Sequence, residues 1–437
     1  MNKHKSSVAT VWSMLLLLNA YRLPAQATFL PAQDTVLKKE QAHTNAFMEG
    51  LLQTGPSFFR QILQNRKPLN VQIIYTQIDR RPDNQPIFRP FYFNVDEGAY
   101  FYPASTVKLP VAVLALQKLH ELSLPGVDKN STLITEAAYS KQSPSYNDPA
   151  AKDGRPTIAQ FIKKIFMVSD NNAFNRLYEF IGQQSINDKL HKMGYADAEI
   201  LHRLQVSMSP DENRHTNPIG LYNESGSVLY TQPMLVNETR YSVRHDSAGI
   251  GFFNNGQLVN HAMDFSGRNR LSLQDLTNML KSVLFPRAVT AKQRFNLTDD
   301  DYRFLKQYMS EWPTESSYPP YNADTAAYWP ALDKFLLYGA EKGPVPPGIR
   351  IFNKIGGAYG FLTDIAYVVD FNRQIEFMLS ATIYCNTDGI LNDDRYDYET
   401  LGMPFMKQLG KMIYEYELNR PRAVKPDLTA FKINYDN

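Results

Sequence analysis

Three β-rich segments lie close together near the C-terminal end of the chain. They are residues 349–355, 361–371 and 374–384. In the last of them Ile375, Phe377 and Leu379 alternate with more polar residues, which is typical of a strand with one buried face. The short Asn372-Arg373 turn before it predicts an antiparallel pair. Because an apolar sheet face must be covered, these segments constrain the chain to a layered fold.

Two further strand-like runs lie near the other end of the chain, at residues 70–78 and 91–95. From Val107 to about residue 345 the pattern is mainly helical, and a last helix around Phe405 has one apolar face suited to a sheet. The simplest arrangement is an α/β (α+β) fold. Its antiparallel sheet, flanked by helices, is formed from both termini, and an all-α domain is inserted between the two halves.

The domain boundaries follow from this arrangement. We expect an α/β subdomain made of residues 28–102 and 346–437 and a helical subdomain of residues 103–345. Two stretches of the helical part are poor in helical pattern, at residues 213–270 and 313–331. Connections this long are usually functional or mobile, so both are predicted insertions.

Residues 1–27 have the pattern of a secretory signal peptide. The basic start is Lys3 and Lys5, the apolar core spans residues 11–18, and Ala25-Gln26-Ala27 forms a small-residue cleavage site. A membrane-spanning helix is the alternative, but the apolar run is too short to cross a bilayer. We therefore expect an exported chain, periplasmic or extracellular, with no membrane span after cleavage.

Composition excludes several partners. Lys and Arg number 46 against 44 Asp and Glu, a formal charge of +2, so nothing electrostatic marks the chain for nucleic acid. The single cysteine, Cys385, cannot form an intramolecular disulfide, and the eight histidines never fall in a zinc-ligand spacing. We expect no metal and no cofactor.

Two short motifs in the helical part contain candidate catalytic residues. Ser105 and Lys108 open an apolar helical run, and a spacing of three puts both side chains on one helical face, where the amine can accept the hydroxyl proton. The second motif, Ser169-Asp170-Asn171, lies between two helical patterns. Taken alone, each has a structural alternative, because Ser, Asp and Asn also cap helices.

A third motif lies at the end of the first C-terminal strand. It reads Asn353-Lys354-Ile355-Gly356-Gly357. Its structural alternative is a tight turn that needs glycines, with a solvated lysine.

In this order, and in an exported chain, the three motifs resemble those of the serine β-lactamase and penicillin-binding protein superfamily, and class A β-lactamases most closely. The resemblance covers most of the mature chain. It implies a monomeric serine hydrolase that acts on a small-molecule β-lactam or related cyclic amide through an acyl-enzyme. Two alternatives stay open: a slowly turning-over penicillin-binding or sensor protein, and a D,D-peptidase acting on peptidoglycan stem peptides.

The resemblance also implies a role for each matched residue. Ser105 would be the acylated nucleophile and Lys108 its activating partner. Ser169 would carry a proton to the leaving nitrogen, and Lys354 would supply the cationic wall of the site.

Further roles follow from the same resemblance. Asn171 would bind the substrate amide, and Asp170 would tie the turn. The backbone N–H groups of Ser105 and Gly357 would form the oxyanion hole, where preorganised donors contribute on the order of 3 kcal/mol each.

Two positions depart from the family pattern. Ile355 stands where the family has a hydroxyl for the substrate carboxylate, so we expect a wider and more apolar site. Gln205 stands in the place of the deacylating glutamate, and an amide cannot take a proton from water. Glu199 and Glu212 lie nearby in the sequence, and spacing favours neither as a substitute.

Overall fold

Five strands form one antiparallel sheet in the computed structural model, which describes residues 43–435. The predicted signal peptide, residues 1–27, lies outside the described residues. The strand order is β12-β13-β14-β1-β2. The bounds are β1 Gln72–Arg80, β2 Pro86–Phe93, β12 Ile349–Ala358, β13 Phe361–Asp370 and β14 Ile375–Tyr384. β1 from the N-terminal part pairs with β14 from the C-terminal part, so both ends of the chain build the sheet, as predicted.

The strands pair antiparallel throughout this sheet. Between β13 and β14 the register runs from Phe361 opposite Tyr384 to Asp370 opposite Ile375. This confirms the antiparallel pair that the Asn372-Arg373 turn predicts.

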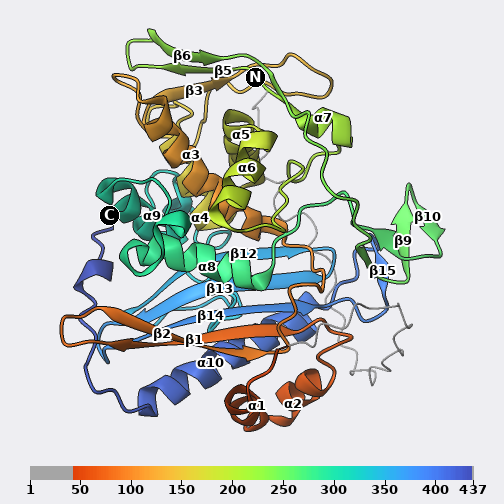
Figure 1. The fold of residues 1–437 in the computed structure, drawn as a ribbon, viewed down its shortest axis with the longest axis vertical. Helices are drawn as coiled ribbons and strands as arrows, with labels where there is room; N and C mark the ends of the chain where they lie inside the picture. The colour runs from red at the N-terminus through yellow and green to blue at the C-terminus, as the bar shows by residue number, and fades with distance from the viewer. Residues whose placement is uncertain (1–42, 436–437) are drawn as a thin grey trace, which may run out of the picture.

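Helices cover both faces of the sheet (Figure 1). One face packs against α1 (Ala46–Gln53), α2 (Ser57–Gln64) and α10 (Met403–Asn419). The other face packs against α8 (Leu273–Leu284), which contacts β1, β13 and β14. Each face has its own apolar core, because side chains of neighbouring strand residues point to opposite sides.

Next to α8 lies α9 (Asp299–Ser310), which contacts both α8 and β12. The remaining helices form a layer beyond α8 (Figure 1). They are α3 (Lys108–Leu122), α4 (Ile158–Val168), α5 (Asn171–Ile181), α6 (Gln183–Met193) and α7 (Pro210–Arg214). Every residue of α3 from Lys108 to Leu116 is buried. A helix that is apolar all round belongs inside the protein, and so the amine at its first residue is buried too.

The middle of the chain also contains short strands, which the all-α expectation lacks. β3 (Thr132–Thr135), β5 (Ile219–Tyr222) and β6 (Val228–Gln232) make a three-stranded sheet beside α3 and far from the main sheet (Figure 1). Strands of four or five residues are too short to show a clear alternation in sequence.

The stretch predicted as an insertion at 213–270 carries several of these short elements. They are β4 (His215–Thr216), β7 (Leu235–Val236), β8 (Ser247–Ala248), β9 (Gly251–Asn254), β10 (Gln257–Val259) and β11 (Met263–Asp264). β9 and β10 form a hairpin that protrudes at one side (Figure 1). Its strand β9 also pairs in parallel with β15 (Ile390–Leu391). Between residues 313 and 331 there are only single 3-10 turns. Across the described part of the chain no helix has the length and apolarity to cross a membrane.

Candidate functional site

Ser105 lies in a short 3-10 turn, Ala104–Val107, that leads into α3. Ala104 before it has a φ of 46°, a region that residues with a side chain rarely adopt and that is often found at functional sites. Gly356 of β12 packs against this turn. A Cβ added to Gly356 would lie 2.6 Å from the carbonyl oxygen of Pro103 and 3.1 Å from the backbone nitrogen of Ser105. The third motif therefore needs a glycine here so that β12 can approach the candidate nucleophile.

The hydroxyl of Ser105 is half-buried, and among residues 43–435 nothing hydrogen-bonds to it. Gly357, one residue beyond the close contact, lies opposite Leu362 in the pairing of β12 with β13. The structure thus places the two predicted oxyanion residues on adjoining segments.

The amine of Lys108 is buried and joins the first motif to the second. Its Nζ donates to the carbonyl oxygen of Ser169 and, at 2.7 Å, to Oδ1 of Asn171, and it lies 3.2 Å from Oγ of Ser169. Burial holds the pKa of Lys108 well below its usual value, and the nearby charge of Lys354 lowers it further. A buried lysine with a lowered pKa can serve as a base.

Ser169 occupies the turn between α4 and α5, with a φ of 55°. Next to it, Asp170 caps α5 by accepting a hydrogen bond from the N–H of Ala173 at 2.7 Å. Lys354 of β12 donates to Oγ of Ser169 at 2.7 Å, and burial lowers the pKa of Lys354 to about 8. The Ser169 hydroxyl therefore receives a hydrogen bond from the third motif and lies beside the amine of the first.

Gln205 also joins the site, from the loop that follows α6. Asn171 donates from Nδ2 to Oε1 of Gln205 at 2.7 Å. The polarity of this chain is set by Lys108, whose amine donates and so requires Oδ1 of Asn171 on its side. Asn171 then offers its NH₂ to Gln205, and only the Gln205 oxygen can accept it. The other terminal atom of Gln205 is consequently an NH₂ group, which cannot accept a proton.

The expectation that Ile355 makes the site more apolar is wrong. Ile355 is 7% exposed and belongs to the core between the sheet and α10. Its neighbours on the strand, Lys354 and Gly356, have contacts with Ser169 and with the Ser105 turn. Because side chains alternate along a strand, Ile355 points to the opposite face of the sheet.

The two acids near Gln205 in sequence are both engaged elsewhere. Glu212 closes a capping box with Ser209 at the start of α7 and accepts a hydrogen bond from Ser140. Glu199 pairs with Arg244 of the insertion at 3.0 Å. Neither carboxylate is placed beside Gln205 by these contacts.

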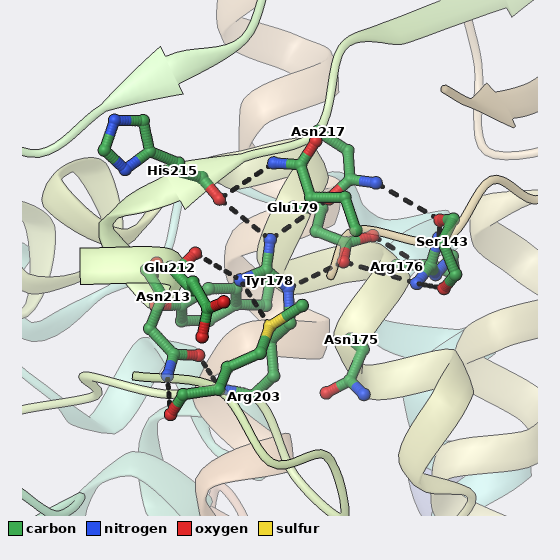
Figure 2. Close-up of polar contacts among 12 residues, drawn as sticks. Ser143, Asn175, Arg176, Tyr178, Glu179, Arg203, Glu212, Asn213, His215 and Asn217 are labelled. Carbon is green, nitrogen blue, oxygen red and sulfur yellow. Dashed lines mark hydrogen bonds and ion pairs between the residues drawn. The ribbon is translucent and has the colours of Figure 1, made fainter. Parts of the chain in front are cut away.

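A buried ionic cluster, not expected from the sequence, fixes the loop that carries Gln205 (Figure 2). Glu179 of α5 lies between Arg203 at 2.7 Å and Arg176 at 3.1 Å. Arg203 also donates to the carbonyl oxygen of His215 and to Asn217. All three charged side chains of the cluster are almost fully buried. The cluster therefore ties the loop, at Arg203, and the segment after α7 to the helix that begins at Asn171.

A second anchor of the loop is Asn175, one turn after Asn171 on α5. It donates to the carbonyl oxygen of Leu204 at 3.0 Å and accepts from the Leu204 N–H at 2.8 Å. These two bonds fix the backbone next to Gln205. One feature of the sequence indicates that α5 has buried polar contacts: its apolar pattern contains Arg176 and Glu179.

Behind Lys354 lies another buried polar group, Asp333. Burial raises its pKa, and its Oδ2 has no hydrogen-bond partner within the described residues. Its charge acts on both Lys108 and Lys354 and opposes the lowering of their pKa values. Asp333 lies outside all three motifs, so spacing did not point to it.

The chain matches one family of known proteins. Residues 58–310 match the model of the β-lactamase enzyme family. No curated protein matches the sequence. Similar solved structures include a β-lactamase from Desulfarculus baarsii, with 13% identity, 84% of this chain and 97% of that chain covered, and a TM-score of 0.44. A class A β-lactamase from Clostridium kluyveri has 15% identity, coverages of 82% and 97%, and a TM-score of 0.43. A protein described as PBP-A has 16% identity, coverages of 82% and 94%, and a TM-score of 0.44.

We predict that Glu179→Gln strongly destabilises the protein, because it leaves Arg176 and Arg203 buried without their shared counterion. Breaking a buried pair in this way costs about 3–5 kcal/mol in the free energy of unfolding. The measurement is urea unfolding. Glu121→Gln is the matched control, because Glu121 pairs with Lys189 at the surface, where a pair contributes about 0–1 kcal/mol. Equal losses in the two variants would contradict the prediction.

Proposed function

This chain belongs to the β-lactamase enzyme family, and from that membership we propose that it is a serine hydrolase that forms an acyl-enzyme on Ser105. The observation that carries the proposal is that the amines of Lys108 and Lys354 both lie at the hydroxyl of Ser169. The substrate we propose is a β-lactam or a related cyclic amide. We also propose export, on the strength of the pattern in residues 1–27, and a monomeric state.

The contacts support a specific route for the proton during acylation. The neutral amine of Lys108 has two N–H groups. One donates to the backbone carbonyl oxygen of Ser169 and the other to the side-chain oxygen Oδ1 of Asn171. Its lone pair is then available for the hydroxyl proton of Ser105. As that proton moves to Lys108, the Ser105 oxygen attacks the substrate carbonyl carbon.

The second half of acylation breaks the carbon–nitrogen bond. Lys354 donates to Oγ of Ser169, so the hydroxyl hydrogen of Ser169 is directed elsewhere and can pass to the leaving nitrogen. Lys108 then returns its extra proton to Ser169 across the 3.2 Å contact. The products are an ester on Ser105 and a neutral amine, with both lysines as they began.

Deacylation is the weak step in this proposal. Water must lose a proton as it attacks the ester, and a general base contributes about 10²–10⁴-fold to such a step. The Gln205 group that faces away from Asn171 is an NH₂, which cannot take a proton from water. This favours a slowly turning-over, penicillin-binding behaviour as the second candidate function.

The proposal is tested by intact mass spectrometry after mixing the protein with benzylpenicillin. We expect an adduct of the penicillin's mass in the native chain and none in Ser105→Ala. Ser310→Ala is the matched control, because Ser310 is a buried serine of α9. An adduct that persists identically in Ser105→Ala would refute the assignment of the nucleophile.

We predict a bell-shaped dependence of acylation rate on pH. Acylation needs Lys108 neutral, so the rate rises with pH through its lowered pKa, and it needs Lys354 charged, so the rate falls above about pH 8, where Lys354 loses its proton. Stopped-flow acylation by a penicillin over a range of pH measures both limbs. Lys354→Arg keeps the cation at high pH and should remove the falling limb. A native rate that climbs steadily well past pH 8 would contradict the role of Lys354.

We further predict that Gln205→Glu raises the rate at which bound acyl groups are released and leaves the acylation rate unchanged. A carboxylate at this position still accepts from Asn171 and has a second oxygen that can take the proton of water. Burst kinetics separates the two rates, and an increase of about tenfold or more in steady-state turnover is expected. Gln205→Asn, a shorter amide, is the control and should stay slow. The idea fails if the native chain shows no burst and Gln205→Glu turns over no faster.

A further inference from the structure

Arg268, in the insertion, is a half-buried cation. Its guanidinium lies 6.0 Å from the ring centre of Tyr359 and has no hydrogen bond or ion pair with any residue from 43 to 435. Two other arginines of this segment have ion pairs: Arg244 pairs with Glu199 and Asp246, and Arg270 pairs with Asp246. The guanidinium of Arg268 is half-exposed, so it can bind an anion without first breaking an ion pair.

An aromatic cluster connects Arg268 with the segments of the candidate site. The ring of Tyr359 lies 5.2 Å from that of Tyr102 and 5.3 Å from that of Phe265. Tyr102 precedes Ser105 by three residues, and Tyr359 follows Gly357 by two. The cluster is therefore attached to both segments that would hold the substrate carbonyl.

No other side chain at the aromatic cluster has a charge that would compete with Arg268 for an anion. Tyr102 stacks on the ring of His202, and burial lowers the pKa of His202 to about 4, so this histidine is neutral at pH 7. Burial also raises the pKa of Tyr102 above its usual value. Asp264 feels the charge of Arg268, but its carboxylate is exposed and accepts from the N–H of Ser266.

The backbone of Arg268 is held in place. Its N–H donates to the carbonyl oxygen of Phe265 at 2.9 Å, and its carbonyl oxygen accepts from Arg244 at 2.6 Å. The next residue, Asn269, accepts from the N–H groups of Leu201 and His202. The backbone that carries the Arg268 side chain is thus fixed against the loop that carries Gln205.

The position of Arg268 identifies which half of a substrate it would meet. Lys354 and Ser169 mark the side of the leaving nitrogen, and β12 runs from Lys354 past Gly357 toward Tyr359. Tyr359 lies in the turn that follows β12, which ends at Ala358, and so beyond Gly357 on the side away from Lys354. We assign this side to the side chain on the acyl half of the substrate.

We propose that Arg268 binds a carboxylate on the acyl half of the substrate, across the aromatic cluster of Tyr102, Phe265 and Tyr359. The inference rests on the proposed function and adds a substrate class to it: amides whose acyl side chain carries a negative charge. A guanidinium suits this role because its planar fork of N–H donors matches a carboxylate.

The test compares two penicillins that differ only in one charge. Both are derivatives of 6-aminopenicillanic acid, one acylated with adipate, which ends in a carboxylate, and one with hexanoate, which ends in a methyl group. The second-order rate constant of acylation should favour the adipoyl compound by about tenfold or more in the native chain. Arg268→Gln should reduce this ratio to about one. Arg240→Gln is the charge-matched control, because Arg240 is an exposed arginine of the same segment, and it should keep the native ratio.

Equilibrium binding of both compounds separates this inference from the proposed function. Calorimetry with Ser105→Ala, alone and combined with Arg268→Gln, should show the same preference for the adipoyl compound and its loss. Adducts on Ser105 with a ratio that ignores Arg268 would overturn the inference and leave the proposed function standing. An Arg268-dependent preference in binding without any adduct would support the anion site and refute the acyl-enzyme. Binding without such a preference, or no binding of either compound, would overturn the inference.

Discussion

The site depends on one hydroxyl oxygen that two buried lysines approach. Lys354 donates to Oγ of Ser169 at 2.7 Å, and Lys108 lies 3.2 Å from the same atom. Two ammonium groups so close together in a buried place would repel each other strongly, so one of them is favoured as a neutral amine. Burial and mutual repulsion both act most on Lys108, while the acids Asp333 and Asp364 support the charge of Lys354. One amine is thereby suited to be a base and the other to remain a cation.

Much of the architecture around this oxygen could be predicted from the sequence, because it depends on local patterns. The alternation in residues 374–384 and the Asn372-Arg373 turn predict a strand pair that the structure contains. The three motifs, far apart in sequence, were placed together only through a family resemblance. The structure brings Lys108, Ser169, Asn171, Lys354 and Gln205 into one chain of contacts.

The features that the sequence could not show depend on how distant segments pack against one another. Ile355 is apolar next to a predicted catalytic lysine, and only the side of β12 on which it lies shows that it fills the core with α10. Asp333 and the pair of Arg203 with Glu179 lie outside every motif, because a buried charge is defined by what surrounds it. The positive φ values of Ala104, Ser169 and Gln205 likewise come from the surrounding structure, since none of these residues favours that conformation on its own.

The order in which the chain is made bears on when this site can exist. Lys354 and Ser169 are 185 residues apart in sequence, and β1 must wait for β14 before it has a partner on that edge. A ribosome that has released the first three hundred residues has supplied Ser105, Lys108 and the turn of Ser169, but neither Lys354 nor the strand β12 that packs beside Ser105. Contacts between such distant segments form late and slowly. The candidate site of the nascent chain is therefore incomplete until its last quarter has joined the sheet.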